Sequence, residues 1–347
     1  MNISERMNHF NVPGVSVSYF EKGKVKWNKC FGTMEKGTEN PVTENSIFHA
    51  CSISKMVTAL CVLKLAQDKK LDLQKDVNEY LTSWKIGDNN FTETRKVTLA
   101  NLLSHQGGLY DQEGSFPPYN SGDKVPTLID LLTGETPYHS EEVTVKYTPE
   151  TDCEYSDAGF VIVAKILEDV FGETVPRLAK RIVFDPLDLQ NTFFWELGKD
   201  NFDRIASCVA GHDSNGDIVA QTRAGYPNIE GAALWTTPRE LAHIANDIIN
   251  AYQGRDSKIL NHHMATFMLS PYGCADDVGM GVFLIRDSSG KPCFASQGWG
   301  VGMQCKLRAY YKDQWGVVVM INSEPGMEQD QSLVGEIIEY VCQNHKL

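Results

Sequence analysis

The stretch Phe48-His49-Ala50-Cys51-Ser52-Ile53-Ser54-Lys55 decides the fold, because it opens a long run of apolar residues at helical spacing. After Ser52 the apolar residues recur every three or four positions, at Ile53, Met56, Val57, Leu60, Cys61, Leu63 and Leu65. This pattern is typical of a helix that is buried on most of its surface. We therefore predict a core helix over residues 52–68. Ser52 would stand at its start, where serine is a favoured residue.

Ser52 and Lys55 are a candidate nucleophile and base. Residues three apart are neighbours on one helix face, with about 5–6 Å between their Cβ atoms. A lysine that close can take the serine proton if burial or nearby charge lowers its pKa. The free N–H groups at the helix N-terminus add a positive dipole end beside the nucleophile. The alternative interpretation is a capped core helix with a surface lysine, and the spacing alone leaves it open.

The Ser-x-x-Lys spacing occurs three times in the chain, so it is a weak signal by itself. The other two pairs are Ser121/Lys124 and Ser288/Lys291. Both lie in short segments that contain Gly and Asp, which are typical of turns. Only the Ser52 pair opens a predicted helix, so we place the chemistry there.

Composition and charge exclude several classes of function. The chain has 347 residues, 42% hydrophobic and 22% charged, which is ordinary for a soluble globular protein with one large or two interleaved domains. Its formal net charge of −13 argues against nucleic-acid binding, which needs a basic face. No segment approaches the ~18 consecutive apolar residues of a membrane span. No apolar stretch follows a basic start, so we expect a cytoplasmic protein; a sequence trimmed of a leader would instead belong to an exported one.

Cysteine and histidine usage predicts neither a metal site nor a cofactor. The nine cysteines are an odd number, are scattered, and form no Cys-x-x-Cys pair. That favours reduced thiols over a disulfide framework or a zinc site. His262-His263 and the other histidines lack the spacing of zinc ligands.

The order of strand and helix patterns predicts an α/β (α+β) fold. Strand patterns lie at both ends of the sequence, at 15–27, 282–285, 305–311 and 316–321. Helical patterns cover 77–84, 98–105, 157–171, 237–249 and 333–342. We predict that residues 1–50 and 270–347 form an antiparallel sheet flanked by terminal helices. Residues 51–269 would form a mainly helical lobe, with loops at 110–150 around a pocket between the lobes.

Several short segments, taken in order, resemble one family. They are Val12-Pro13-Gly14-Val15, Phe48 to Lys55, Leu102-Leu103-Ser104-His105-Gln106-Gly107-Gly108-Leu109, Tyr155-Ser156-Asp157 and Asp185-Pro186-Leu187. In these the chain is similar to the penicillin-recognising serine hydrolases. The similarity is greatest to the branch of class C β-lactamases, low-molecular-weight penicillin-binding proteins, D-aminopeptidases and related esterases. The resemblance covers nearly the whole chain and implies a β-lactamase/transpeptidase-like fold and an acyl-enzyme mechanism.

The resemblance also implies roles for three side chains. Ser52 matches the nucleophile and Lys55 its partner base. Tyr155 matches the tyrosine of the family's Tyr-x-Asn element, which passes the proton to the leaving group. A tyrosine has an ordinary pKa of about 10 and needs a nearby cation to act as a base, which Lys55 could supply. Tyr226-Pro227-Asn228 also fits Tyr-x-Asn, but a helix follows Tyr155 directly, so we prefer Tyr155.

The family's third element aligns with Ser296-Gln297-Gly298, which Trp299 follows. By position, the backbone N–H groups of Ser52 and Trp299 would form the oxyanion hole, and backbone donors tolerate a change of side chain. The segment Gly298-Trp299-Gly300-Val301-Gly302 superficially resembles a nucleotide-binding loop. No helix follows it, so we reject that interpretation.

Two departures from the family pattern predict a shift of substrate. Asp157 stands where the family usually has Asn, and Ser296 where it has Lys or His. The pocket thereby moves about two charge units away from anion recognition, and we expect Asp157, Ser296, Gln297 and Gly298 to contact a small-molecule or short-peptide substrate. A neutral ester or amide, or a substrate with an amino group near Asp157, should bind better than penicillin. Asp157 could instead pair with Lys55, and Arg223 or Arg308 could restore a carboxylate site.

We therefore predict a serine hydrolase that acts as a peptidase, amidase or esterase in preference to an efficient β-lactamase. A true class C-type β-lactamase or a D-Ala-D-Ala carboxypeptidase is the alternative. A non-catalytic penicillin-binding-like module is a second alternative, although such a module has no need of Ser52, Lys55 and Tyr155 together. An α/β-hydrolase is disfavoured because Gly-x-Ser-x-Gly is absent from the sequence. The sequence makes no prediction of oligomeric state.

Overall fold

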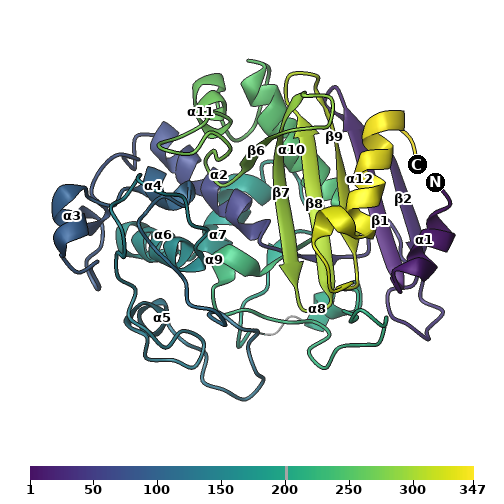
Figure 1. The fold of residues 1–347 in the computed structure, drawn as a ribbon, viewed down its shortest axis with the longest axis horizontal. Coiled ribbons are helices and arrows are strands. Elements are labelled where there is room, and N and C mark those ends of the chain that lie inside the picture. The colour runs from purple at the N-terminus through teal and green to yellow at the C-terminus, as the bar shows by residue number, and fades with distance from the viewer. Residues whose placement is uncertain (200–201) are drawn as a thin grey trace.

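A six-stranded antiparallel sheet forms one side of the molecule in the computed structural model, which describes residues 1–199 and 202–347 (Figure 1). The strand order is β2-β1-β9-β8-β7-β6. The strands are β1 (Gly14–Glu21), β2 (Lys24–Gly32), β6 (Phe283–Arg286), β7 (Pro292–Gly300), β8 (Met303–Tyr310) and β9 (Trp315–Ile321). The two ends of the sequence meet where β1 pairs with β9, with Val17 opposite Val319. The predicted closure of the terminal strands into one sheet is confirmed.

Two terminal helices, α1 (Ile3–His9) and α12 (Leu333–Asn344), cover one face of this sheet (Figure 1). Alternate residues of β1 and β9 point toward them, because successive side chains of a strand lie on opposite faces. The buried residues of this layer include Val15, Val17, Val317, Val319, Ile321, Leu333, Ile337 and Ile338. The Arg6 guanidinium also bonds both carboxylate oxygens of Glu336, at 2.6 and 2.7 Å, and so ties α1 to α12.

The opposite face of the sheet is covered by α10 (Pro238–Tyr252), which packs against β1, β2 and β9. Thr237 caps this helix, since its hydroxyl accepts a hydrogen bond from the Glu240 backbone N–H at 3.2 Å. By residue number α10 falls inside the predicted helical lobe, yet it packs on the sheet. The lobe boundaries at residues 50/51 and 269/270 stay a prediction. The packing of α10 on the sheet shows that contacts cross these boundaries.

Most of the remaining helices lie at the left and centre of Figure 1, and short strands form a small second sheet of order β3-β5-β4. The longer helices are α2 (Ser54–Gln67) and α6 (Asp157–Phe171). The shorter helices and turns are η1 (Val77–Glu79), α3 (Asn90–Thr94), α4 (Leu99–Leu103), α5 (Leu128–Thr133), α7 (Val175–Ala179), η2 (Lys180–Phe184), α8 (Phe202–Ile205), α9 (Ile229–Ala232), α11 (His262–Met268) and η3 (Gln329–Gln331). The second sheet consists of β3 (Phe48–Cys51), β4 (Phe193–Phe194) and β5 (Leu234–Thr236).

The helix predicted over residues 52–68 is present as α2, but it begins two residues later. Its N-cap is Ile53, which has no capping side chain, so Ser52 is not the helix cap that the sequence suggested. The helix is buried almost all round, as predicted, because it lies between α9 on one side and α7, η2 and α11 on others. The predicted helix at 77–84 is wrong beyond the short turn η1.

Helix α6 has the bounds that the sequence predicted, and both ends have a local cause. The Ser156 hydroxyl accepts a hydrogen bond from the Gly159 backbone N–H at 3.1 Å. Gly172 ends the helix at φ 65°, a left-handed conformation that glycine adopts without strain. Within the described residues, no helix is both long and apolar enough to cross a bilayer.

Candidate active site

Ser52 lies at a sharp corner between β3 and α2. Cys51, the residue before it, has φ 47°, a left-handed conformation that is uncommon for a residue with a side chain. The Lys55 backbone N–H then donates to the Ser52 carbonyl at 3.1 Å, so the chain turns at once into α2. Strained corners of this kind are concentrated at functional sites. The corner places Ser52 just before the first turn of α2.

Gly298 explains how the sheet approaches this corner. A Cβ atom built at Gly298 would lie 2.2 Å from the carbonyl oxygen of Ala50. Only glycine therefore lets β7 pass so close to the end of β3. The crossing brings the third-element segment Ser296-Gln297-Gly298 beside Ser52, as the family resemblance implies.

Lys55 is the centre of the site. Its residue is 3% exposed, and its ammonium donates to three oxygens. These are Asp157 Oδ1 at 2.7 Å, the Gly231 carbonyl at 2.9 Å and Ser52 Oγ at 3.4 Å. The three N–H donors of the ammonium are thus matched by three acceptors. Ser52 and Lys55 are brought together as the sequence predicted.

Lys55 does not have the lowered pKa that a lysine needs in order to act as a base. Burial lowers the pKa of Lys55, but Asp157 and Tyr155 together outweigh burial and the pKa is raised. Lys55 is therefore an ammonium in the resting site, where it donates to Ser52. It can accept the serine proton only as one of its own protons moves to Asp157, or to Tyr155 while that phenol passes its own proton on.

Tyr155 stands over the same ammonium. Lys55 Nζ lies 4.8 Å from the centre of the Tyr155 ring, and the residue is 44% exposed on its outer side. Burial of the hydroxyl end raises the pKa of Tyr155, whereas Lys55 and the Ser52 hydroxyl lower it. The structure thus brings together Ser52, Lys55 and Tyr155, the three side chains to which the sequence analysis assigned catalysis.

His105 is a site residue that the sequence analysis did not single out. Its ring stacks on the Tyr155 ring with centroids 4.4 Å apart, and its Nδ1 accepts from the Ser156 backbone N–H at 3.2 Å. Burial, with a further contribution from Lys55, lowers the pKa of His105 to about 3. His105 is therefore neutral at physiological pH and holds Tyr155 in place. The segment Leu102 to Leu109 contains His105 and carries part of the family resemblance, so it could have pointed to this residue.

Asp157 pairs with Lys55, which was the open alternative for its role. Its Oδ1 accepts from Lys55 Nζ at 2.7 Å and from Asn228 Nδ2 at 2.9 Å. Asn228 belongs to the Tyr226-Pro227-Asn228 segment that was set aside as a second match. Tyr226 itself stacks on His49 at 5.3 Å and its hydroxyl accepts from the Val301 backbone N–H at 3.1 Å. The geometry thus supports the preference for Tyr155.

Asp111 is a second residue that the sequence analysis missed. Its carboxylate accepts from the Ser156 hydroxyl at 2.9 Å and from the Asp157 backbone N–H. Burial raises the pKa of Asp111, and the charge of Asp157 adds to the effect. Asp111 fixes the start of α6 and with it the positions of Tyr155 and Asp157. It lies in the polar 110–150 loops, where no local pattern marks it.

The third element presents a free strand edge. The pairing of β7 with β6 runs from Arg286↔Pro292 to Phe283↔Ala295 and stops there. Within the described residues, β7 beyond Ala295 is paired on its β8 side, and its other edge faces the site. Trp299 is 37% exposed on this edge. The oxyanion hole assigned to the Ser52 and Trp299 N–H groups stays a prediction.

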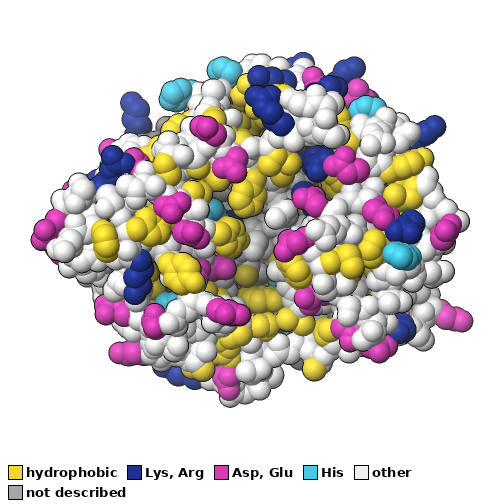
Figure 2. All heavy atoms as spheres, viewed as in Figure 1, with side chains coloured by type: hydrophobic (Ala, Val, Ile, Leu, Met, Phe, Trp, Pro, Cys, Tyr) yellow, Lys and Arg dark blue, Asp and Glu magenta, His cyan; other side chains and the backbone are white. Residues whose placement is uncertain are grey.

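A small cavity joins these parts. It is lined by Ser52, Lys55, His105, Tyr155, Gly281, Val282, Phe283, Ser296 and Gln297 and has a volume of about 20 Å³. That is room for about one water molecule, so a reacting carbonyl must reach Ser52 from outside this cavity. Figure 2 shows a hollow at the centre of the face. Acidic side chains stand on both sides of this hollow (Figure 2).

Lys55 is the one cation among the residues that line this cavity. Arg223 donates to the Cys208 carbonyl at 3.2 Å and lies 3.9 Å from Glu35. Arg308 is paired with Glu339 of α12, on the other face of the sheet. Neither arginine lines the cavity, so neither restores a carboxylate-binding cation there.

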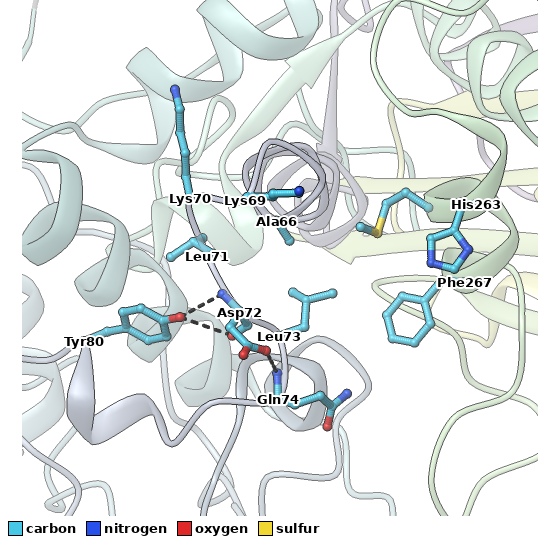
Figure 3. Close-up of a pocket in the computed structure, with 11 residues that line it drawn as sticks. Ala66, Lys69, Lys70, Leu71, Asp72, Leu73, Gln74, Tyr80, His263 and Phe267 are labelled. Atoms are coloured by element: carbon cyan, nitrogen blue, oxygen red, sulfur yellow. Dashed lines mark hydrogen bonds between the residues drawn. The ribbon is translucent and has the colours of Figure 1, made fainter.

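A larger cavity of about 570 Å³ lies elsewhere, at the C-terminal end of α2 (Figure 3). Leu71, Leu73 and Phe267 form its apolar part, and Lys70 points away from it (Figure 3). None of the predicted site residues lines it. Its size therefore does not make it the site of the chemistry. In the described part of the chain, no three His, Cys, Asp or Glu side chains are grouped as metal ligands.

Comparison with known proteins assigns the family. The family model described as "Beta-lactamase" matches residues 2–341. A curated relative, the teichoic acid D-alanine hydrolase of Staphylococcus aureus, is 25% identical over 309 residues, which cover 88% of this chain and 70% of the relative.

Solved structures agree on the fold. The D-amino acid amidase from Ochrobactrum anthropi SV3 has a TM-score of 0.76 at 20% identity, covering 98% of each chain. The beta-lactamase/D-alanine carboxypeptidase from Yersinia pestis has a TM-score of 0.76 at 16% identity, covering 99% of this chain and 96% of the other. With the family model matching almost its full length, this chain belongs to the Beta-lactamase family and is a serine hydrolase.

Proposed function

We propose that this protein hydrolyses small esters or amides of D-amino acids, and that D-alanine is the first acyl group to test. The names of the similar proteins support this substrate class: a teichoic acid D-alanine hydrolase, a D-amino acid amidase and a D-alanine carboxypeptidase. The three names share a D-amino acid and differ in the bond. Whether a neutral or an anionic substrate binds must therefore be inferred from the charges of the site residues in this chain.

The charge of the cavity carries the proposal. The ammonium of Lys55 is compensated by Asp157 at 2.7 Å, and the β7 side of the cavity offers the uncharged Ser296 and Gln297. A substrate carboxylate entering this site would meet no free cation among the lining residues and would approach Asp157. A neutral carbonyl group, or a substrate with an ammonium, avoids that repulsion.

The proposed reaction has two steps. Ser52 Oγ attacks the carbonyl carbon and the bond to the alcohol or amine breaks, which leaves an acyl-Ser52 ester. The proton of Ser52 passes to the leaving group through Lys55 and Tyr155, with Asp157 balancing the charge of Lys55 as the proton moves. Water then attacks the acyl-Ser52 ester, releases the D-amino acid and restores the hydroxyl. The N–H groups of Ser52 and Trp299 are proposed to hold the developing oxyanion.

The experiment compares five substrates under identical conditions: D-alanine p-nitroanilide, D-alanine methyl ester, the two L-enantiomers and benzylpenicillin. We expect kcat/KM for the D-compounds to exceed that for the L-compounds by at least about tenfold, as one well-placed contact provides. Benzylpenicillin, which carries a carboxylate, should be the poorest of the five. Equal rates for both enantiomers, or penicillin turnover above that of the D-amide, would contradict the proposal.

We also propose that the protein works in the reducing environment of the cytoplasm. All nine cysteines, each of which lies in the described residues, are free thiols. A set of unpaired thiols is typical of proteins in reducing compartments. Fractionation of cells that express the tagged protein tests this, and recovery outside the cytosolic fraction would contradict it.

A further inference from the structure

Glu230 is a buried carboxyl group next to the active site that the reaction above does not use. It lies in α9 and is 2% exposed. Its Oε1 atom is fully buried and has no hydrogen-bond partner among the described residues. A buried polar atom without a partner is costly, and its presence asks for a reason.

The turn that carries Glu230 holds the catalytic helix. The Glu230 carbonyl accepts from the Thr58 hydroxyl at 2.8 Å, and the Gly231 carbonyl accepts from Lys55 Nζ at 2.9 Å. Lys55 and Thr58 are three residues apart and therefore lie on one face of α2. A displacement of the Glu230–Gly231 backbone would thus act directly on Lys55.

Within the described residues Glu230 forms no ion pair, and the neighbouring cations already have carboxylate partners. Lys55 is paired with Asp157, and Glu168 is paired with Lys165 at 3.3 Å. From β3, His49 bonds the Ala232 carbonyl at 2.6 Å, and burial lowers its pKa to about 4, so it stays neutral. The buried thiols of the neighbouring strand and helix, Cys51 and Cys61, also have pKa values raised by burial and stay uncharged.

We propose that Glu230 is a positioning residue for Lys55, which supports the active site only as an uncharged carboxylic acid and turns the enzyme off when it ionises. The inference rests on Ser52 and Lys55 carrying the reaction. In the protonated state α9 packs against α2 without adding a third charge to the Lys55–Asp157 pair. In the ionised state an unpaired buried anion draws on the Lys55 ammonium, repels Asp157 and displaces the turn that holds Lys55.

The direction of the pH dependence follows from burial. Burial is the largest cause that raises the pKa of Glu230, to about 8, and Asp157 adds to it. The acid is therefore protonated at neutral pH and ionises above about pH 8. The rate of Ser52 acylation should fall through this range, because the added anion holds the proton on Lys55 more tightly.

The test is the pH profile of acylation for the wild type and Glu230→Gln, an uncharged side chain of nearly the same shape. A fluorophosphonate serves as the probe, so the result is independent of the proposed substrate class. We expect the Glu230→Gln rate at pH 7 to lie within about threefold of wild type, and its fall above pH 8 to disappear. Glu79→Gln, a surface change of the same kind, should keep the wild-type profile.

Two results would overturn the proposal. One is an alkaline fall in Glu230→Gln at the same pH as in wild type, which would assign the fall to Lys55 or Tyr155. The other is an equal loss of rate at every pH, which would make Glu230 a purely structural residue. If Ser52→Ala were still labelled, the proposed Ser52 chemistry would be contradicted. That result is distinct from the two results that concern Glu230.

Thermal unfolding provides a check that does not need activity. A carboxyl whose pKa is raised in the folded state stabilises the protein most below its unfolded pKa, about 4.3, and that contribution is lost as pH rises to about 8. The melting temperature of wild type should therefore fall relative to that of Glu230→Gln between pH 5 and pH 8. A constant difference over this range would contradict a proton bound at Glu230.

Discussion

At the residue scale, the charge of the site depends on Asp157, a carboxylate at a position where the family resemblance implies an amide. Asp157 accepts from Lys55 and from Asn228, so it is used inside the site and is not free for substrate. Its charge opposes the effect of burial and, together with Tyr155, raises the pKa of Lys55 and keeps Lys55 protonated. A neutral side chain of the same shape would preserve the contact with Lys55 and remove the charge.

We predict that Asp157→Asn lowers the pKa of Lys55 and so shifts the pH profile of Ser52 acylation to lower pH. The reason is that burial, which lowers the pKa of Lys55, is then no longer opposed by the carboxylate. The measurement is the acylation rate from pH 5 to pH 10. Asp256→Asn removes a carboxylate that is 92% exposed and should leave the profile unchanged. An unmoved or upward-shifted profile in Asp157→Asn would contradict this role.

The sequence predicted that Ser52, Lys55 and Tyr155 lie together, because a helical spacing and an ordered set of short segments mark them. It could not identify Asp111, Asn228 or Glu230. Their roles depend on the approach of segments more than forty residues apart, such as Asp111 to Ser156 and Asn228 to Asp157. No local pattern reports such an approach.

At the element scale, the position of Ser52 depends on the crossing of β3 and β7. Gly298 permits this crossing, because a Cβ there would lie 2.2 Å from the Ala50 carbonyl oxygen. Cys305 Sγ, from the next strand, also donates to the same carbonyl at 3.3 Å. The crossing therefore sets the distance between the Ser52 corner and the free edge of β7.

We predict that Gly298→Ala lowers the acylation rate by about 100-fold, as expected for a displacement of roughly 1 Å between reacting groups. It should also lower the melting temperature, because two buried strands must separate. Gly87→Ala is the matched control, since a Cβ at Gly87 meets nothing within 4 Å. Wild-type acylation in Gly298→Ala would show that β7 does not form part of the site.

The ends of a helix were predictable where a capping residue in the sequence sets them. Where no such residue is present, the predicted end was wrong. Ser156 and Gly172 fix α6 at the predicted residues. The start of α2 was misplaced by two residues, because the left-handed Cys51 turns the chain before the helix begins. Helical periodicity alone cannot report that turn.

At the scale of the whole molecule, the antiparallel sheet formed from both ends of the chain was predictable from strand alternation at the termini. The place of α10 was not, because an amphipathic pattern shows that a face is buried and does not show against what. The packing of α10 on β1 and β9 comes from contacts far apart in sequence. The cavity at Ser52 is likewise a product of the assembled fold.

The distribution of cysteines gives a test of the whole fold. Of the nine free thiols, Cys274 is exposed and most of the others are buried; burial raises the pKa of the half-buried Cys153 to about 11. We predict that Ellman's reagent at pH 8 modifies about one thiol rapidly in the native protein. In denaturant it should modify all nine. Fewer than nine in denaturant would indicate disulfides and contradict the structure.

The most direct test of the account is the site of covalent labelling. The protein is exposed to a fluorophosphonate, digested, and the adduct located by tandem mass spectrometry. We predict one adduct, on Ser52, with none in Ser52→Ala and a rate at least about 100-fold lower in Lys55→Ala, the usual size of a lost proton-transfer partner. An adduct on another residue, or labelling of Ser52→Ala at the wild-type rate, would contradict the central claim that Ser52 is the nucleophile.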